Sequence, residues 1–255
     1  MNNTKNLKIG ILGAGNIGKT LARKLAQAGH DVKVANSRGP ETIAADALEF
    51  GARAVEAAEA VRDVEVVILS LPPTSFSKVA PLLAGLPEEA VVIDTSNYHP
   101  ARDNRIEALD AGQVESLWVV EQLGRPIVKA WNTIESPPFA TKGTTKGSRD
   151  RIAIPVAADR ETDRQVALAL VEDTGFDAFD AGRLENSWRQ QPGAPAYCTD
   201  LTLAELPDAL VWAQKERLPK RRDMAWAILT ERFDDITNLN PDAGYFLRLS
   251  RLLNM

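Results

Sequence analysis

The stretch that most constrains the fold is residues 7–18, where an apolar run ends at a glycine-rich turn with the spacing G-x-G-x-x-G. Apolar residues at helical spacing follow, so the stretch is typical of a buried parallel strand, a tight turn and a helix. The first glycine permits the turn, the second lets backbone approach a pyrophosphate, and the third lets helix and strand pack closely. The helix N-terminus would stabilise the phosphate charge. The alternative is that the glycine-rich turn belongs to a doubly wound fold but binds no nucleotide. We expect a dinucleotide to be held by Gly13, Ala14, Gly15, Asn16, Ile17 and Gly18.

The second expected strand ends in Asn36-Ser37-Arg38, where the ribose of an adenosine half would lie. An acidic residue there would accept hydrogen bonds from a free 2′-hydroxyl, whereas a nearby arginine accommodates a 2′-phosphate. Arginine suits phosphate because its planar guanidinium donates two parallel hydrogen bonds. Ser37 and Arg38 therefore favour NADP(H) over NAD, although a solvated surface arginine is the alternative.

Strand-like and helix-like segments alternate along much of the chain. Right-handed crossovers between such strands predict an α/β protein, a Rossmann-like doubly wound fold with a mainly parallel sheet. We expect this NADP-binding domain over 1–187 and a helical C-terminal extension over 188–255. Pro40 indicates a helix over 41–50, and the Gly-, Thr- and charge-rich segment 142–150 indicates a loop. The expected strands are 7–12, 32–35, 52–55, 64–71, 90–94, 127–131, 152–157 and 176–181.

Ligands of open α/β sheets bind at the carboxyl ends of the strands. Ser70, Leu71 and Pro72 end one central strand, and we expect them to flank the middle of the cofactor. Asn97 follows the next strand and would lie near the nicotinamide, or would serve only as a turn residue. His99 falls near the same edge and is a weak acid/base candidate, since most lone histidines have no chemistry.

Composition excludes several other classes of function. The net charge of −5 argues against a nucleic-acid partner, and no apolar stretch is long enough to span a membrane. Cys198 is the single cysteine, has no identifiable activating partner and is predicted to be a structural thiol, so no metal site is expected. The basic run 215–222 is predicted to be a solvated surface. Residues 1–6 are polar and give no sign of a signal peptide, so we expect a cytoplasmic protein.

Three segments resemble one known family. The glycine motif with Ser37-Arg38, then 129–134 (Lys-Ala-Trp-Asn-Thr-Ile), then 180–187 (Asp-Ala-Gly-Arg-Leu-Glu-Asn-Ser), are similar to the NADP oxidoreductases that act on the deazaflavin coenzyme F420. The resemblance covers roughly 7–187 and implies a homodimer that moves hydride between NADPH and a planar tricyclic acceptor. The archaeal enzymes carry His-Thr-Ile at 132–134 and lack the helical extension. By position, the residues bordering nicotinamide and acceptor would be Asn97, Asn132, Thr133 and Ile134.

We therefore expect an NADPH-dependent oxidoreductase with a small-molecule hydride acceptor such as a deazaflavin, flavin or quinone-like compound. No catalytic set is evident, and only His99 and Asn132 are weak catalytic candidates. One alternative is a non-catalytic NADP(H) sensor that acts through a protein partner bound to the extension. Another is a hydroxy-acid or amino-acid dehydrogenase with a helical dimerisation domain, for which the extension looks short.

Overall fold

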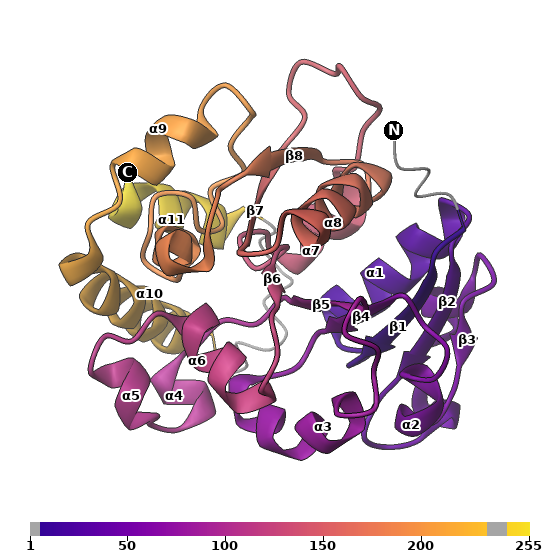
Figure 1. Ribbon diagram of the computed structural model, residues 1–255. Coiled ribbons are helices and arrows are strands. Elements are labelled where there is room, and N and C mark those ends of the chain that lie inside the picture. The colour runs from indigo at the N-terminus through magenta and orange to yellow at the C-terminus, as the bar shows by residue number, and fades with distance from the viewer. Residues whose placement is uncertain (1–5, 234–243) are drawn as a thin grey trace.

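The computed structural model describes residues 6–233 and 244–255. Residues 1–5, on which the signal-peptide prediction rests, lie outside this range. The described residues form one sheet in the order β3-β2-β1-β4-β5-β6-β7-β8 (Figure 1). The strands are β1 (Lys8–Leu12), β2 (Asp31–Ala35), β3 (Arg53–Ala54), β4 (Val66–Leu69), β5 (Val91–Asp94), β6 (Val128–Lys129), β7 (Ala153–Ala158) and β8 (Asp177–Asp180).

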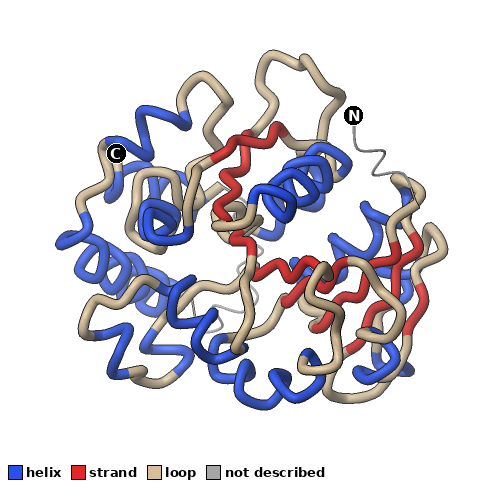
Figure 2. Tube along the Cα trace, viewed as in Figure 1, coloured by secondary structure: helices blue, strands red, loops and turns tan. Residues whose placement is uncertain are grey.

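Helices cover both faces of this sheet (Figure 2). The α-helices are α1 (Asn16–Gln27), α2 (Ala57–Ala60), α3 (Phe76–Leu83), α4 (Pro100–Asp103), α5 (Glu107–Asp110), α6 (Glu115–Leu123), α7 (Ser136–Thr141), α8 (Glu161–Asp173), α9 (Leu206–Val211), α10 (Leu218–Arg232) and α11 (Tyr245–Asn254). The 3₁₀ turns are η1 (Pro40–Thr42), η2 (Ala45–Leu48), η3 (Pro73–Ser75), η4 (Leu184–Gln190) and η5 (Lys215–Arg217).

Alternation along the central strands produces two hydrophobic cores. Ile68 packs with α1, α7 and α8 on one face, whereas Leu69 packs with α2, α3 and α6 on the other. Both faces are therefore buried, which is why these strands read as unbroken apolar runs in the sequence. The predicted Rossmann-like, mainly parallel fold is confirmed.

Strands β7 and β8 are the exception to the parallel arrangement, because β7 runs antiparallel to β6 and parallel to β8. The pairing of β7 with β6 is limited to Ala157 and Ala158, so the first half of β7 projects past the carboxyl edge of the sheet. Pro155 sits in this projecting half, in register with Phe179 of β8. A proline is tolerated there because β6 does not reach that position to accept a hydrogen bond.

The helix predicted over 41–50 is wrong. The segment forms two short turns, η1 and η2, separated by extended backbone at Ile43 and Ala44. Ile43 and Ala47 are buried in the core that contains α1, and the extended link lets both side chains reach it. Tertiary packing thus overrides the local helical pattern. The loop predicted over 142–150 is present as a non-regular segment after α7.

The C-terminal extension packs on the projecting half of β7 and on β8. Leu201, Leu206 and Leu210 form a small core with Ala153 and Phe179, and an antiparallel bridge joins Ile152 to Thr202. Helices α10 and α11 lie beyond this core (Figure 1). The boundary at residue 188 stays a prediction. Within 6–233 and 244–255, no helix combines the length and apolar character needed to cross a bilayer.

Candidate functional site

A cavity of about 990 Å³ opens at the carboxyl edge of β1, β4, β5 and β6. One wall comes from the glycine turn and the strand ends, and the other comes from the C-terminal extension, mainly α10 and α11. The lining includes ten predicted site residues: Gly15, Asn16, Ile17, Ser70, Leu71, Pro72, Asn97, His99, Asn132 and Ile134. The other predicted residues, Gly13, Ala14, Gly18, Ser37, Arg38 and Thr133, do not line it.

The glycine turn has the geometry that a pyrophosphate site requires. Gly13 has a φ of 106°, and a Cβ there would lie 2.1 Å from the Ser70 carbonyl oxygen. A Cβ on Gly18 would lie 1.8 Å from the Gly13 carbonyl oxygen, so this glycine permits α1 to pack against the turn. A Cβ on Gly15 would meet nothing within 4 Å, which leaves the N-terminus of α1 open to a ligand. No acidic side chain occupies the first turn of α1, so the dinucleotide fits here.

The tip after β2 is held in a defined turn. The Asn36 side-chain oxygen accepts a hydrogen bond of 2.9 Å from the Arg38 backbone N–H, and its amide donates to Thr42 Oγ1. Gly39 then adopts a φ of 98°. The tip lies beside the glycine turn because the Gly13 N–H donates to the Ala35 carbonyl at 2.8 Å. Within the described residues, the exposed Arg38 guanidinium makes no ion pair.

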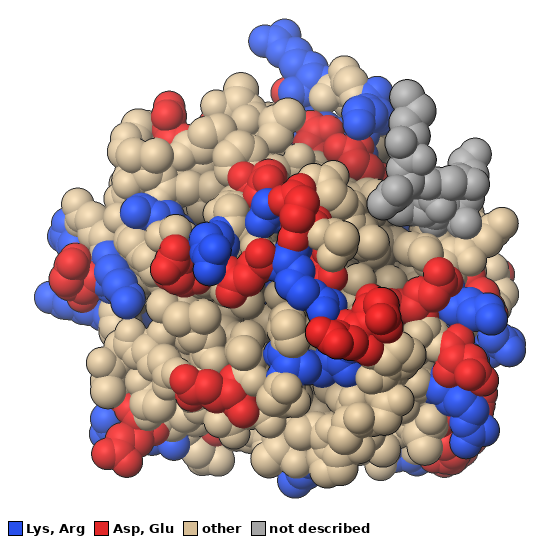
Figure 3. Space-filling model, viewed as in Figure 1, with Lys and Arg blue, Asp and Glu red and all other residues tan. Residues whose placement is uncertain are grey.

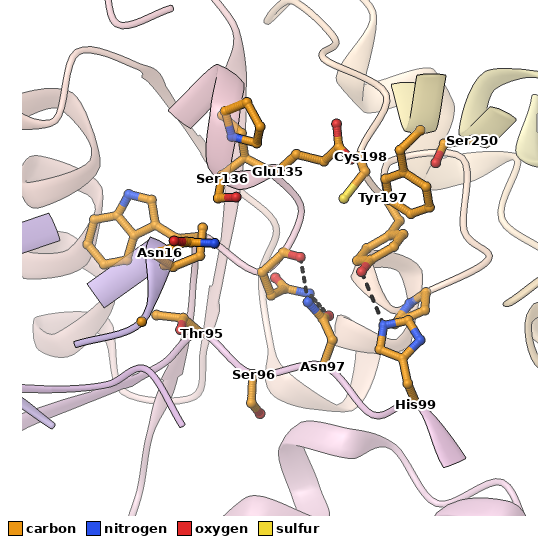
Figure 4. Close-up of a pocket in the computed structure, with 18 of the residues that line it drawn as sticks. Asn16, Thr95, Ser96, Asn97, His99, Glu135, Ser136, Tyr197, Cys198 and Ser250 are labelled. Atoms are coloured by element: carbon orange, nitrogen blue, oxygen red, sulfur yellow. Dashed lines mark hydrogen bonds between the residues drawn. The ribbon is translucent and has the colours of Figure 1, made fainter. Parts of the chain in front are cut away.

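Asn97 and Asn132 form a reciprocal pair at the ends of β5 and β6 (Figure 4). Asn97 Nδ2 donates to the Asn132 carbonyl at 2.8 Å, and Asn132 Nδ2 donates to Asn97 Oδ1 at 3.1 Å. Asn132 Nδ2 also donates to the Gln190 carbonyl, 2.9 Å away. Asn132 Oδ1 is buried without a hydrogen-bond partner. Because an unpaired buried acceptor is costly, this oxygen suits a ligand N–H or O–H in the cavity.

A buried ion pair between Lys129 and Asp94 stabilises the carboxyl edge of the sheet near Asn97 and Asn132. Lys129 Nζ lies 2.7 Å from Asp94 Oδ2 and donates to the Ser96 carbonyl at 2.5 Å. Both charged side chains are almost completely excluded from solvent. The pair ties the end of β5 to β6 and so fixes the loop that carries Asn97. Trp131 directly precedes Asn132 and adopts a φ of 58°, which is uncommon for a non-glycine residue. This conformation directs the chain into Asn132.

His99 lies in the cavity wall but is not poised to titrate. Burial and the nearby Arg102 and Arg222 lower its pKa to about 3, so the imidazole is neutral at neutral pH. Its Nε2 is 3.3 Å from the Tyr197 hydroxyl (Figure 4), and its ring centroid is 5.2 Å from that of Trp226. The ring is therefore held by contacts from the C-terminal extension.

The extension supplies site residues that the sequence did not indicate. Tyr197, Trp226 and Phe246 give the far wall of the cavity an aromatic character. Arg221 and Arg222, from the basic run predicted to be solvated, also line it. Burial raises the pKa of Cys198 well above its usual value, so the thiol is uncharged. The cavity therefore brings together residues that lie far apart in the chain. Of its two walls, the sequence indicated only the one that contains the Asn-Thr-Ile segment.

One further lining residue, Glu135, directly follows Ile134 and was not singled out from the sequence. Burial, with the Asp200 carboxylate adding to it, raises the pKa of Glu135 to about 8. No cluster of His, Cys, Asp and Glu suited to a metal ion occurs in the described part of the chain. On the face in Figure 3, acidic and basic side chains are interspersed.

Residues 8–98 match the model of the family described as NADP oxidoreductase coenzyme F420-dependent. The resemblance inferred from the sequence is thereby confirmed. The protein YjhV of Escherichia coli K12 is 46% identical over 70 residues, which are 28% of this chain. The match spans 51% of the length of that relative. The family match supports a nicotinamide dinucleotide as the cofactor.

Solved structures show the same fold. A hypothetical protein, SMa0349, from Sinorhizobium meliloti has a TM-score of 0.67 and 29% identity, covering 77% of this chain and 95% of its own. A candidate F420-dependent NADP reductase from Arthrobacter sp. FB24 has a TM-score of 0.56 and 20% identity. It covers 71% of this chain and 87% of its own. At that identity the likeness concerns the fold alone.

Proposed function

We propose that the protein is an NADPH-dependent oxidoreductase that passes hydride between NADP(H) and a small planar acceptor of the deazaflavin, flavin or quinone type. The observation that carries the proposal is that one continuous cavity runs from the open glycine turn to an aromatic wall. Flat faces such as those of Tyr197 and Trp226 offer a planar ring a stacking surface. When bound, the nicotinamide supplies hydride, and the protein positions the two rings.

The preference for NADP(H) rests on the tip at Ser37 and Arg38. The turn around Asn36 fixes the Arg38 backbone, and the guanidinium is free of any acidic partner in the described residues. A 2′-phosphate would therefore gain a charge-assisted hydrogen bond without displacing an existing ion pair. Deeper in the site, the unpaired Asn132 Oδ1 would accept a hydrogen bond from the nicotinamide carboxamide.

Binding measurements test the cofactor assignment. We expect Arg38→Ala to weaken NADPH binding about tenfold or more while leaving NADH binding unchanged, because only NADPH carries the 2′-phosphate. Arg62→Ala is a matched control, since Arg62 is also exposed but is paired with Glu59. Equal NADPH affinity in the Arg38 variant and the parent would refute the 2′-phosphate assignment.

Turnover measurements test the reaction. Oxidation of NADPH should be followed at steady state with a panel of deazaflavins, flavins, quinones and aldehydes. We expect turnover with at least one planar ring acceptor. Tight NADPH binding without turnover of any acceptor would reject the proposal and favour a non-catalytic sensor.

A further inference from the structure

Glu135 is an acidic side chain at the junction of the two walls of the cavity. It begins the turn into α7, directly after the segment that carries Asn132, and it lines the cavity. Its side chain extends toward Cys198 of the C-terminal extension (Figure 4). The two segments are joined there, because the Cys198 N–H donates to the Thr133 carbonyl at 2.9 Å. The carboxyl thus lies between the strand ends on the cofactor side and the wall on the acceptor side.

No cation among residues 6–233 and 244–255 forms an ion pair with this carboxyl. Lys142 is the basic residue that acts on Glu135, but its Nζ lies 2.9 Å from Asp200 Oδ2 and forms an ion pair with it. Asp200 and Cys198 lie close enough to Glu135 to interact with it, and neither of them carries a positive charge. Within the described residues, the Glu135 carboxyl makes no ion pair or hydrogen bond. An unpaired acid beside another carboxylate favours its protonated form.

The other polar groups of the cavity are poor proton donors. His99 is neutral because burial lowers its pKa to about 3. Burial raises the pKa of Tyr197 and that of Cys198 well above their usual values, so both hold their protons. An effective general acid has a pKa near the working pH. Among these lining groups, Glu135 alone meets that condition, with a pKa of about 8.

We propose that the Glu135 carboxyl is the proton donor of the reaction and that the acceptor carries a basic nitrogen or oxygen conjugated to the atom that receives hydride. This role rests on the function proposed above. The acceptor gains one hydride, which carries two electrons, from the bound nicotinamide, and its nitrogen or oxygen gains the proton from Glu135 Oε. The products are the reduced acceptor, NADP⁺ and the Glu135 carboxylate, which solvent protonates again.

The protonation state can be tested without turnover. We expect the infrared spectrum of the cofactor-free protein to show a protonated carboxyl band that disappears as the pH rises through about 8. Glu135→Gln, which preserves the size of the side chain, should lose the component that titrates near pH 8 and keep any band from Glu115, whose pKa burial raises to about 7. Glu216→Gln changes an exposed glutamate outside the cavity and should retain the band. A parent protein without such a band would overturn the inference.

The kinetic test distinguishes proton donation by Glu135 from hydride transfer by the cofactor. We expect Glu135→Gln to bind NADPH as tightly as the parent but to lower kcat about 10²- to 10³-fold with little change in the acceptor KM. The parent should lose reduction rate as the pH rises through about 8, because reduction needs the protonated acid. Oxidation of the reduced acceptor by NADP⁺ needs the carboxylate and should show the opposite trend. The Gln variant should lose both trends.

The outcomes distinguish the two proposals. A parent that turns over while Glu135→Gln keeps the same kcat and pH profile would overturn the inference alone. A parent that binds NADPH but reduces no acceptor would overturn the proposed function and the inference with it. Partial rescue of kcat in Glu135→Asp, which restores a carboxyl on a shorter chain, would support the proton-donor role.

Discussion

Asn132 gives both of its amide hydrogens to protein oxygens, those of Asn97 and Gln190, and leaves its own Oδ1 without a donor. The side chain is therefore fixed in orientation, and its acceptor is buried and unpaired in a residue that lines the cavity. A fixed and unpaired acceptor binds a ligand N–H without the cost of first ordering the side chain.

The first prediction concerns this oxygen. We expect Asn132→Ala to weaken NADPH binding by about 1–2 kcal/mol, because the carboxamide N–H would lose its acceptor. Binding of adenosine 2′,5′-bisphosphate, which lacks the nicotinamide, should be unchanged. Isothermal titration of both ligands checks this, and an equal loss for the two would show that the variant perturbs the whole site.

The second prediction concerns the glycine that faces the ligand. Gly15 has a φ of −71°, which any residue adopts, and free space around its Cβ position. Gly15→Ala should therefore keep the parent melting temperature but weaken NADPH binding, because the new methyl occupies the path of the pyrophosphate. Thermal unfolding and fluorescence titration check the two parts, and unchanged affinity would move the phosphate away from this turn.

Gly18 provides the matched third prediction. Its Cβ position lies 1.8 Å from a backbone oxygen, so Gly18→Ala must shift α1 away from the turn. Overpacking of this kind costs about 1–3 kcal/mol. We expect a lower unfolding free energy in urea, in contrast to the Gly15 variant. Equal stability of the two variants would contradict the close approach seen here.

The fourth prediction concerns the buried ion pair. Lys129→Met leaves Asp94 charged, buried and without its cation, which typically costs about 3–5 kcal/mol. Adding Asp94→Leu removes the stranded charge, so the double variant should recover part of the loss. Urea unfolding of both variants and the parent measures the coupling. A single variant as stable as the parent would show that the pair adds nothing to the fold.

The fifth prediction addresses the extension. Trp226→Ala removes the ring that faces His99 and should raise the acceptor KM while leaving NADPH affinity unchanged. Trp212→Ala is the control, because this tryptophan is 61% exposed and does not line the cavity. If both variants keep the parent KM, the extension does not contact the acceptor.

The strands and their order along the chain were predictable because apolar runs such as 64–71 reflect burial on both faces of a sheet. The glycine motif also located the turn at Gly13, since its φ and its close contacts are local requirements. The error at 41–50 arose where buried Ile43 imposed an extended link that local propensity does not encode.

The cavity wall formed by the C-terminal extension, where we place the acceptor, was not predictable in the same way. Nothing in the sequence indicates that Tyr197 and Trp226 reach His99, because those contacts depend on how the extension folds back. The perturbation of Glu135 likewise arises from burial and from Asp200, which lies far along the chain. Local sequence patterns therefore predicted residues on the cofactor side of the cavity. Residues on the opposite side could be identified only from the tertiary structure.

The reversed strand β7 makes the two sides of the site mechanically different. The cofactor side consists of the ends of parallel strands, each of which is hydrogen-bonded to a neighbouring strand on either side. The acceptor side is built on the half of β7 that projects beyond β6 and is supported chiefly by β8 and the small core around Leu206. Under the proposed function, substitutions in that core would reshape the choice of acceptor while sparing dinucleotide recognition, so the scaffold could acquire new substrates without rebuilding its cofactor site.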